Sequence, residues 1–282
     1  MLKRRVYLFP SDPTTAPAAS RQLEREGWVL LRGVFGPDEV DQLRREIGDI
    51  YEAEPPDARQ SHQVAALAEQ FRYEMFNRLG ACQRAMANRA ILDVVEPLLG
   101  EDCHVIANTA WRNPANVEHL HGGGRWHIDA GPHIPRLPGT AWPEDIPYPI
   151  FAVASHVLLQ DCPIECGPTG VIPFSHTSGQ PPSSSRGDDP ELTYNGVGPV
   201  VLAAEAGDVQ LFVSDVWHRR MPTGPGDAGR FFLQVHYGRR DLAQRLRPTS
   251  DSNQLSPAAI ERARSDRDRT LIGLHPPLFY DG

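Results

Sequence analysis

The sequence predicts a mainly β protein flanked by helices. From Cys103 to Tyr237 the chain offers short runs of β-prone residues, each interrupted by glycine or proline. Closely spaced strands with turn residues between them are typical of a β-sandwich or a small barrel. Much of the preceding hundred residues shows instead the apolar spacing of amphipathic helices. The 27 prolines and 24 glycines also favour a loop-rich β protein over a helical bundle.

The first hundred residues supply the predicted helices. The segment APAASRQLEREG suits a helix that ends at Gly27, and WVLLRGVF, from Trp28 to Phe35, follows as a short strand. The next helix opens at Pro37 and carries acidic residues in its first turn, where they suit the positive end of the helix dipole. A further apolar-faced helix, NRAILDVVEPLLG, closes at Gly100.

The predicted strands follow after that point. Their segments are CHVIANTAW, RWHID, IFAVASHVLLQ, GVIPF, GPVVLAA, DVQLFVS and RFFLQVHYG. Two long loops interrupt them, PHIPRLPGTAWPEDIPYP and TSGQPPSSSRGDDPELTYNG, and loops of such length are usually functional or mobile. We expect a single domain over residues 1–282, with a helical part at about 14–100, a β core at about 102–240 and a tail at 241–282 that includes one weak, charged helix.

Composition and charge limit the classes of partner. The net charge of −8 and the lack of a long basic run argue against nucleic acid and against anionic membrane surfaces. No run of 18 apolar residues is present that would span a bilayer, and the N-terminus has no apolar segment of signal-peptide length. We therefore expect a cytoplasmic protein without a membrane or nucleic-acid partner, and leave its oligomeric state open.

The four cysteines fit a reducing compartment. Cys82, Cys103, Cys162 and Cys166 show no pattern of a secreted disulfide scaffold, so free thiols are the preferred interpretation. The spacing of Cys162 and Cys166 would also suit half of a zinc site, but no second Cys or His pair at zinc spacing follows.

One short segment, GGGRWHIDAG, combines an imidazole and a carboxylate. His127 and Asp129 are two positions apart, so on a strand both would point to one side. With His218, which comes after the segment DVQLFVS, they would form the two-histidine, one-carboxylate triad of non-haem Fe(II) oxygenases, with positions left for a cosubstrate and dioxygen. The His-x-Asp pattern alone is weak, because a chain with 11 histidines can match it by chance. The three glycines are interpreted as a flexible lead-in.

A single arginine strengthens the metal hypothesis. Arg230 follows His218 by 12 positions and begins the segment RFFLQVHYG. A guanidinium near an iron site suits a bidentate carboxylate partner, and 2-oxoglutarate carries such a group remote from its chelating end.

Several motifs in order resemble the phytanoyl-CoA dioxygenase family of Fe(II)/2-oxoglutarate oxygenases, over roughly residues 20–240. They are LEREGWVLLRGVFGPDEVDQLRREI, RWHIDAG, HVLLQDCPIECGPTGVIPFSH and AGDVQLFVSDVWHRRMPTGPGDAGRFFLQVHYG. The resemblance implies a double-stranded β-helix, a cupin-like jelly roll, flanked by helices.

The same resemblance implies roles for individual residues. It makes His127, Asp129 and His218 the iron ligands and Arg230 the anchor of the 2-oxoglutarate 5-carboxylate. His156 is a candidate contact to the cosubstrate.

Candidate substrate contacts are less strongly indicated. Arg112 and His133 lie near the metal motif in the sequence, and Phe232 and Gln234 share a strand face with Arg230. The aromatic residues Trp111, Trp142 and Phe232 suit an apolar pocket wall, although core or loop packing explains the two tryptophans equally well.

The chain also departs from the family pattern. The usual Pro-Gly-Ser-His is PFSH here, CGPTG replaces the common Asn-Gly-Pro, and Arg220 stands two positions after the distal histidine, where a small hydroxyl residue is frequent. Halogenating relatives lack the acidic ligand, so the presence of Asp129 argues against halogenation.

These observations predict an Fe(II)- and 2-oxoglutarate-dependent dioxygenase that hydroxylates a small organic molecule, as a tailoring step of secondary metabolism. Two alternatives stay open. One is a cupin-type metalloenzyme without 2-oxoglutarate, in which Arg230 would have no anchoring role. The other is a non-catalytic jelly-roll binding module, which would not need an intact triad.

Overall fold

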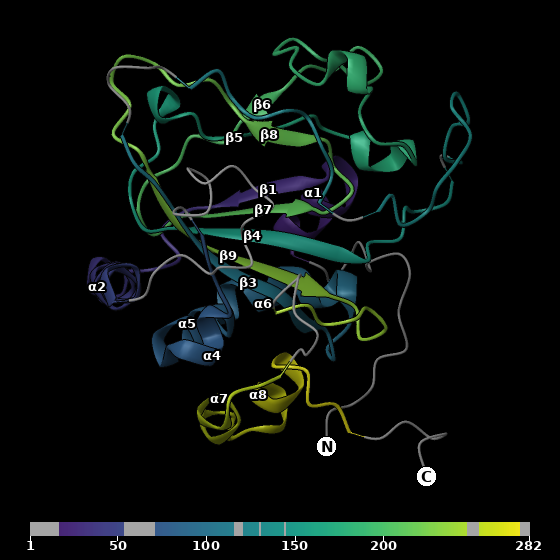
Figure 1. The fold of residues 1–282 in the computed structure, drawn as a ribbon. Helices are drawn as coiled ribbons and strands as arrows, with labels where there is room; N and C mark the ends of the chain where they lie inside the picture. Colours follow the sequence, from purple (N-terminus) through teal and green to yellow (C-terminus); the bar gives the residue numbers. More distant parts are fainter. Residues whose placement is uncertain are drawn as a thin grey trace.

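Two antiparallel sheets form the centre of the molecule (Figure 1). The computed structural model describes residues 17–53, 71–115, 121–129, 131–143, 145–246 and 254–276. The larger sheet has six strands in the order β1-β7-β4-β9-β3-β2, and the smaller has the order β6-β5-β8. Val171 of the small sheet packs with Ala154 and Phe212 of the large one, so the sheets share an apolar layer. The predicted β architecture is therefore confirmed.

The strand bounds largely follow the predicted segments. The strands are β1 Trp28–Leu31, β2 Phe71–Tyr73, β3 His104–Asn113, β4 Ala152–Leu158, β5 Thr169–Val171, β6 Val200–Val201, β7 Val209–Val213, β8 His218–Arg220 and β9 Arg230–Gly238. The three-residue strands β2 and β8 were not predicted, because each is shorter than the four residues over which alternation can be recognised.

Side-chain alternation along the large sheet separates two environments. On β9, Phe231, Leu233, Val235 and Tyr237 belong to the main apolar core. Phe232, between the first two of these, instead joins a cluster with Leu158 and Cys166. Successive strand residues point to opposite faces, so one face of the sheet packs on helices and the other faces the small sheet.

Helices cover the outer face of the large sheet (Figure 1). They are α1 Ala18–Glu26, α2 Pro37–Ala53, α4 Met75–Arg78, α5 Gly80–Met86 and α6 Arg89–Leu99. The predicted helices up to Gly27, from Pro37 and up to Gly100 are confirmed. In α2, Val40, Leu43 and Ile47 are three and four positions apart, so they lie on one face of the helix, and this face packs in the core.

Short 3-10 turns lie in the connections from β4 to β5 and from β5 to β6. They are η2 Ile164–Cys166, η3 Ser175–Ser178 and η4 Ser184–Arg186. None of the helices in the described parts of the chain is long and apolar enough to cross a membrane.

The C-terminal tail packs against the helical layer rather than forming one exposed helix. It contains α7 Pro257–Arg262 and α8 Asp266–Leu271, capped by the side chains of Ser256 and Ser265. The guanidinium of Arg262 donates to Gln83 Oε1 at 2.6 Å and to the Phe76 carbonyl at 2.6 Å. The tail is therefore held to α4 and α5.

Candidate metal centre and its pocket

Backbone pairing brings two histidines together at the edge of the small sheet. His127 and His218 form a β-bridge in which each N–H donates to the other's carbonyl at 3.0 Å. The Asp129 N–H then donates to the Ser214 carbonyl at 3.1 Å. The predicted strand RWHID thus reduces to a single bridge, but its residues still reach one site.

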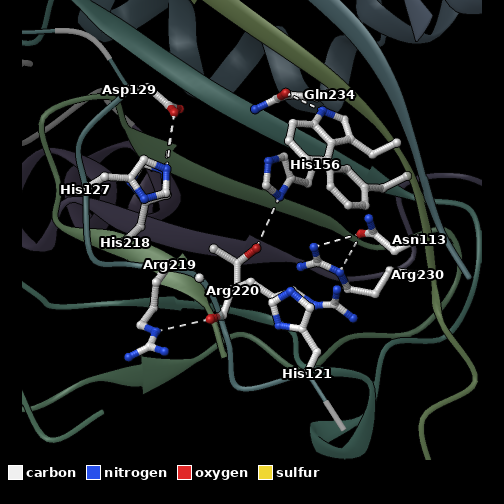
Figure 2. Close-up of a pocket in the computed structure, with 14 residues that line it drawn as sticks. Asn113, His121, His127, Asp129, His156, His218, Arg219, Arg220, Arg230 and Gln234 are labelled. Atoms are coloured by element: carbon white, nitrogen blue, oxygen red, sulfur yellow. Dashed lines mark hydrogen bonds and ion pairs between the residues drawn. The ribbon is translucent and has the colours of Figure 1, made fainter. Parts of the chain in front are cut away.

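The three candidate ligands converge closely. Potential ligand atoms of His127, Asp129 and His218 all lie within 4.8 Å of one another. Asp129 Oδ1 is 3.4 Å from His218 Nε2 and 3.8 Å from His127 Nε2 (Figure 2). The structure therefore assembles the predicted triad from segments far apart in the sequence.

Hydrogen bonds to the backbone orient both imidazoles for metal binding. His127 Nδ1 lies 2.8 Å from the Arg125 carbonyl, and His218 Nδ1 lies 2.9 Å from the Val216 carbonyl. Because a carbonyl only accepts, each Nδ1 must carry the hydrogen, which leaves the Nε2 lone pair directed at the shared site. Such outer contacts are the usual way in which metal-binding histidines are oriented.

The charges at the triad also suit a divalent cation. Burial on its own would raise the pKa of Asp129, but the surrounding histidines, His218 foremost, hold it well below its usual range. Partial burial lowers the pKa of His127, with a further contribution from His218, which favours a neutral imidazole. Burial would also lower the pKa of His218, but the charge of Asp129 and its hydrogen bond raise it overall, so a metal ion competes with a proton there. Two imidazole nitrogens and one carboxylate fit Fe(II).

A third histidine, His236, contacts the triad and was missed from the sequence. Its Nε2 lies 3.5 Å from Asp129 Oδ2, the oxygen that does not face His127 and His218. The side chain is only 13% exposed, and this burial lowers the pKa of His236, which favours a neutral imidazole. Strand alternation could have indicated it, because His236 is an even number of positions after Arg230 on the same strand and so shares its face.

A pocket of about 240 Å³ extends from the triad between the sheets. Figure 2 shows the triad on one side of this pocket and Arg230, Asn113 and His121 on the other. The lining residues are Trp111, Asn113, His121, Gly124, His127, Asp129, His156, Thr169, His218, Arg219, Arg220, Arg230, Phe232 and Gln234.

Arg230 is a buried cation in contact with uncharged groups. Its Nε and Nη2 donate to Asn113 Oδ1 at 3.1 and 2.8 Å, and its Nη1 donates to the Gly167 carbonyl at 3.2 Å. Burial, followed by the charge of Arg220, lowers the pKa of Arg230 to about 9. A buried cation is costly without an anionic partner, so this environment suits a carboxylate ligand.

His156, Phe232 and Gln234 also line the pocket, and their roles as ligand contacts stay predictions. His156 Nδ1 lies 3.3 Å from both Thr169 Oγ1 and Gln210 Oε1, and burial lowers its pKa to about 3. The Phe232 ring stacks on Trp111 with centroids 5.8 Å apart.

The amide of Gln234 is held in one orientation. The Trp111 Nε1–H donates to Gln234 Oε1 at 2.8 Å. An indole N–H can only donate, so the amide must accept with its oxygen.

Two predicted substrate contacts lie elsewhere. Arg112 is next to Trp111 and Asn113 on β3, so alternation turns it to the opposite face, where it donates to Glu52 at 3.0 Å. The prediction for Arg112 therefore needs correction.

The structure does not bring His133 to the pocket either. Its N–H donates to Asp215 Oδ2 at 3.0 Å, its ring bonds to the other oxygen of Asp215, and it stacks on Phe151 with centroids 5.1 Å apart. His133 thus fastens a loop to the β7–β8 turn. Trp142 similarly packs edge-on against Tyr148 rather than lining the pocket.

Of the three glycines before the metal motif, Gly123 lies closest to β8. Gly123 has φ of 88°, and a Cβ there would lie 2.4 Å from Arg219 Nη2 and 2.8 Å from the Arg220 carbonyl. Arg219 in turn donates to the Gly122 and Asp188 carbonyls, both at 3.1 Å. Glycine is needed here because the loop passes directly over β8.

The two neighbouring cysteines are both buried. Cys162 and Cys166 are buried free thiols, and within the described residues neither belongs to a cluster that could hold an ion.

Solved structures of several non-haem enzymes share this fold. SnoN, an α-ketoglutarate-dependent epimerase from nogalamycin biosynthesis, aligns with a TM-score of 0.62 at 18% identity, over 87% of this chain and 95% of SnoN. The carbocyclase SnoK from the same biosynthesis aligns with a TM-score of 0.61 at 16% identity, over 86% and 94%. HygX from Streptomyces hygroscopicus, with nickel and 2-oxoglutarate bound, gives 0.56 at 18% identity, over 79% and 86%. At such identities the likeness shows the fold, a jelly roll.

The sequence comparison identifies the family. No curated protein sequence matches the chain significantly. The family model described as phytanoyl-CoA dioxygenase (PhyH) matches residues 23–222, which is most of the chain and includes all three triad residues. The chain therefore belongs to the phytanoyl-CoA dioxygenase family of non-haem, 2-oxoglutarate-dependent enzymes.

Proposed function

We propose that this protein is an Fe(II)- and 2-oxoglutarate-dependent dioxygenase that hydroxylates a small organic molecule in secondary metabolism. The observation that carries the proposal is the joint presence, in one pocket, of a triad with free Nε2 lone pairs and of the buried cation Arg230. The first fits Fe(II), and the second fits the 5-carboxylate of the cosubstrate.

Each group of pocket residues has its own role in the proposed reaction. His127, Asp129 and His218 hold the iron, which with 2-oxoglutarate activates dioxygen for oxidation of a C–H bond when bound. Arg230 binds the 5-carboxylate and so orients the cosubstrate toward the metal. Phe232 and the neutral His156 exclude water between these two ends.

The substrate is proposed to approach from the His127 side. The His127 side chain is 52% exposed, whereas that of His218 is 6% exposed, so the triad opens toward solvent in one direction. SnoN in complex with nogalamycin RO and HygX with hygromycin B support a small secondary metabolite as the substrate class.

The same site supports related outcomes. SnoN is an epimerase and SnoK a carbocyclase, so epimerisation or ring closure is a second candidate that would use the same cosubstrate and iron ligands. Mass spectrometry of the product distinguishes them, because hydroxylation adds one oxygen, ring closure removes two hydrogens and epimerisation leaves the mass unchanged.

Anaerobic binding tests the proposal. Fe(II) and 2-oxoglutarate added to the protein should give the weak visible absorbance band of the chelate. Arg230→Ala should weaken the apparent 2-oxoglutarate affinity at least about tenfold, because a charge-assisted bond to a buried guanidinium is lost. Arg112→Ala, on the opposite face of the sheet, is the matched control. Metal uptake without a band would favour the cupin-type alternative, and no metal uptake would favour a binding module.

We also propose a single domain and a cytoplasmic location. One apolar core joins residues from the N-terminal helices, the large sheet and the tail, which supports a single folding unit. All four cysteines are free and buried, which supports a reducing compartment.

A further inference from the structure

A second guanidinium lies beside Arg230 at the end of the pocket opposite the triad. Arg220 is two positions after His218 on β8, so both side chains point to the space between the sheets. The Arg220 side chain is 13% exposed. Figure 2 shows Arg220, Arg230 and His121 on the same side of the pocket. Burial lowers the pKa of His121, and the charges of both arginines lower it further, in keeping with this proximity.

One turn of backbone holds both guanidiniums. Arg220 Nη2 donates to the Cys166 carbonyl at 3.4 Å, and Arg230 Nη1 donates to the next carbonyl, that of Gly167, at 3.2 Å. Gly167 has φ of 64°, and a Cβ there would lie 2.5 Å from the Met221 carbonyl and 3.2 Å from Arg220 Nε. Two departures from the family pattern, the Cys-Gly-Pro segment and Arg220, thus meet in a direct contact.

The charges at this end do not balance. Asp227 is buried, accepts from the Gly229 N–H at 2.8 Å with Oδ1, and places Oδ2 3.9 Å from Arg220 Nη2. That distance is too long for a hydrogen bond, and within the described residues Asp227 Oδ2 and Arg220 Nε have no hydrogen-bond partner. The buried Arg230 and the largely buried Arg220 face one buried anion, Asp227, which leaves one positive charge uncompensated.

We propose that Arg220 is a second anchor for the cosubstrate, so that Arg220 and Arg230 hold the 5-carboxylate of 2-oxoglutarate between them. This inference rests on the proposed function. One bound carboxylate supplies the missing negative charge, and its two oxygens supply acceptors for both guanidiniums. Arg220 then takes the place of the small hydroxyl residue that is frequent at this position in the family.

The test compares two ligands that differ only at the anchored end. Binding of 2-oxoglutarate and of 2-oxopentanoate, which has the same chelating end but no 5-carboxylate, is measured by calorimetry on Ni(II)-loaded protein. The variants are Arg220→Ser, which restores a small hydroxyl, and Arg220→Gln, which removes the charge but keeps most of the length. Arg112→Ser is the control for loss of an arginine elsewhere, and thermal unfolding checks that each variant is folded.

The pair of ligands separates an anchoring role from a structural one. Both Arg220 variants should lose at least about tenfold in affinity for 2-oxoglutarate and keep the wild-type affinity for 2-oxopentanoate. Unchanged 2-oxoglutarate affinity, or an equal loss for both ligands, overturns the anchor and leaves Arg220 as the structural partner of Asp227. Wild-type protein that binds the two ligands equally would instead overturn the proposed 2-oxoglutarate dependence itself.

Discussion

Each triad residue has a contact on the side that faces away from the proposed metal position. The carbonyls of Arg125 and Val216 set the hydrogen position on the two imidazoles, and His236 contacts the second oxygen of Asp129. Contacts of this kind determine which lone pairs face the metal, so they affect affinity without touching the ion.

Removing the carboxylate should weaken metal binding and abolish turnover. Asp129→Ala leaves two imidazoles and no negative charge to balance a divalent cation, so we expect weaker iron binding and loss of iron-dependent succinate formation. Metal content and succinate release measure the two effects. Asp241→Ala, which removes an exposed carboxylate, is the control. Wild-type turnover in the Asp129 variant would disprove the assignment.

His236 should act as a positioning residue for Asp129. His236→Leu leaves Asp129 Oδ2 without this contact, and we expect metal affinity to fall about 10- to 100-fold. His236→Gln keeps a polar hydrogen-bonding group and should recover part of the loss. Calorimetric titration with Ni(II) gives the affinities. If the leucine variant binds metal as the wild type does, or if glutamine gives no recovery, the contact has no positioning role.

Strand alternation organises the molecule at the level of the element. On β9 the odd-numbered residues pack on the helices, while Arg230, Phe232, Gln234 and His236 lie on the pocket side. The same rule on β3 explains why Asn113 supports Arg230 and its neighbour Arg112 does not reach the pocket.

A buried histidine links the 3-10 turn η3 to α1 and should make stability depend on pH. His176 Nε2 contacts the Glu24 carbonyl at 3.0 Å, and burial lowers the pKa of His176 to about 4 from 6.5. Below pH 6.5 the unfolded chain takes up a proton that the folded protein does not, so stability falls as the pH falls toward 4.

We expect the titration of His176 to lower the free energy of unfolding by about 1.4 kcal/mol when the pH falls from about 7.5 to about 5.5. Urea unfolding of the wild type and of His176→Gln at the two pH values measures it. The glutamine variant should show a pH dependence smaller by that amount. An identical pH dependence in both proteins would mean that His176 titrates normally.

At the scale of the whole molecule, the tail completes the helical layer. Leu271, Ile272 and Ala259 are buried in the same core as the large sheet and the N-terminal helices. Arg267 adds a bond to Glu96 Oε1 at 2.9 Å and one to the Cys103 carbonyl at 2.9 Å. The tail therefore stabilises the fold without reaching the pocket.

Substitution in the tail should lower stability and spare the site. Leu271→Ala should reduce the free energy of unfolding by about 2–5 kcal/mol, because it opens a cavity in the core. Ile260→Ala, at a residue 37% exposed in the same tail, should change it by less than about 0.5 kcal/mol. Thermal or urea unfolding gives both values. Equal effects of the two substitutions would show that the tail is not part of the core.

The amino-acid sequence by itself determined the periodicities and the chemistry. Alternation and helical spacing are local, so α1, α2, α6 and most strands could be predicted from short segments. The triad was predictable because its residue types and order match a family that the chain is shown to belong to, over residues 23–222. Arg230 lies beyond those residues, and its anchoring role stays a prediction from the chemistry of the guanidinium. Phe232 and Gln234 could be placed because they lie two and four positions after Arg230 and share its strand face.

Tertiary structure decided everything that depends on contacts between distant segments. Alternation predicts that Arg112 and its neighbours point to opposite sides, but only the packing of helices on one face shows which side is the pocket. The contacts of His236 with Asp129 and of Arg220 with Cys166 join residues far apart in the chain. No local pattern encodes such distances, because they are set by how the sheets and the turns between them pack.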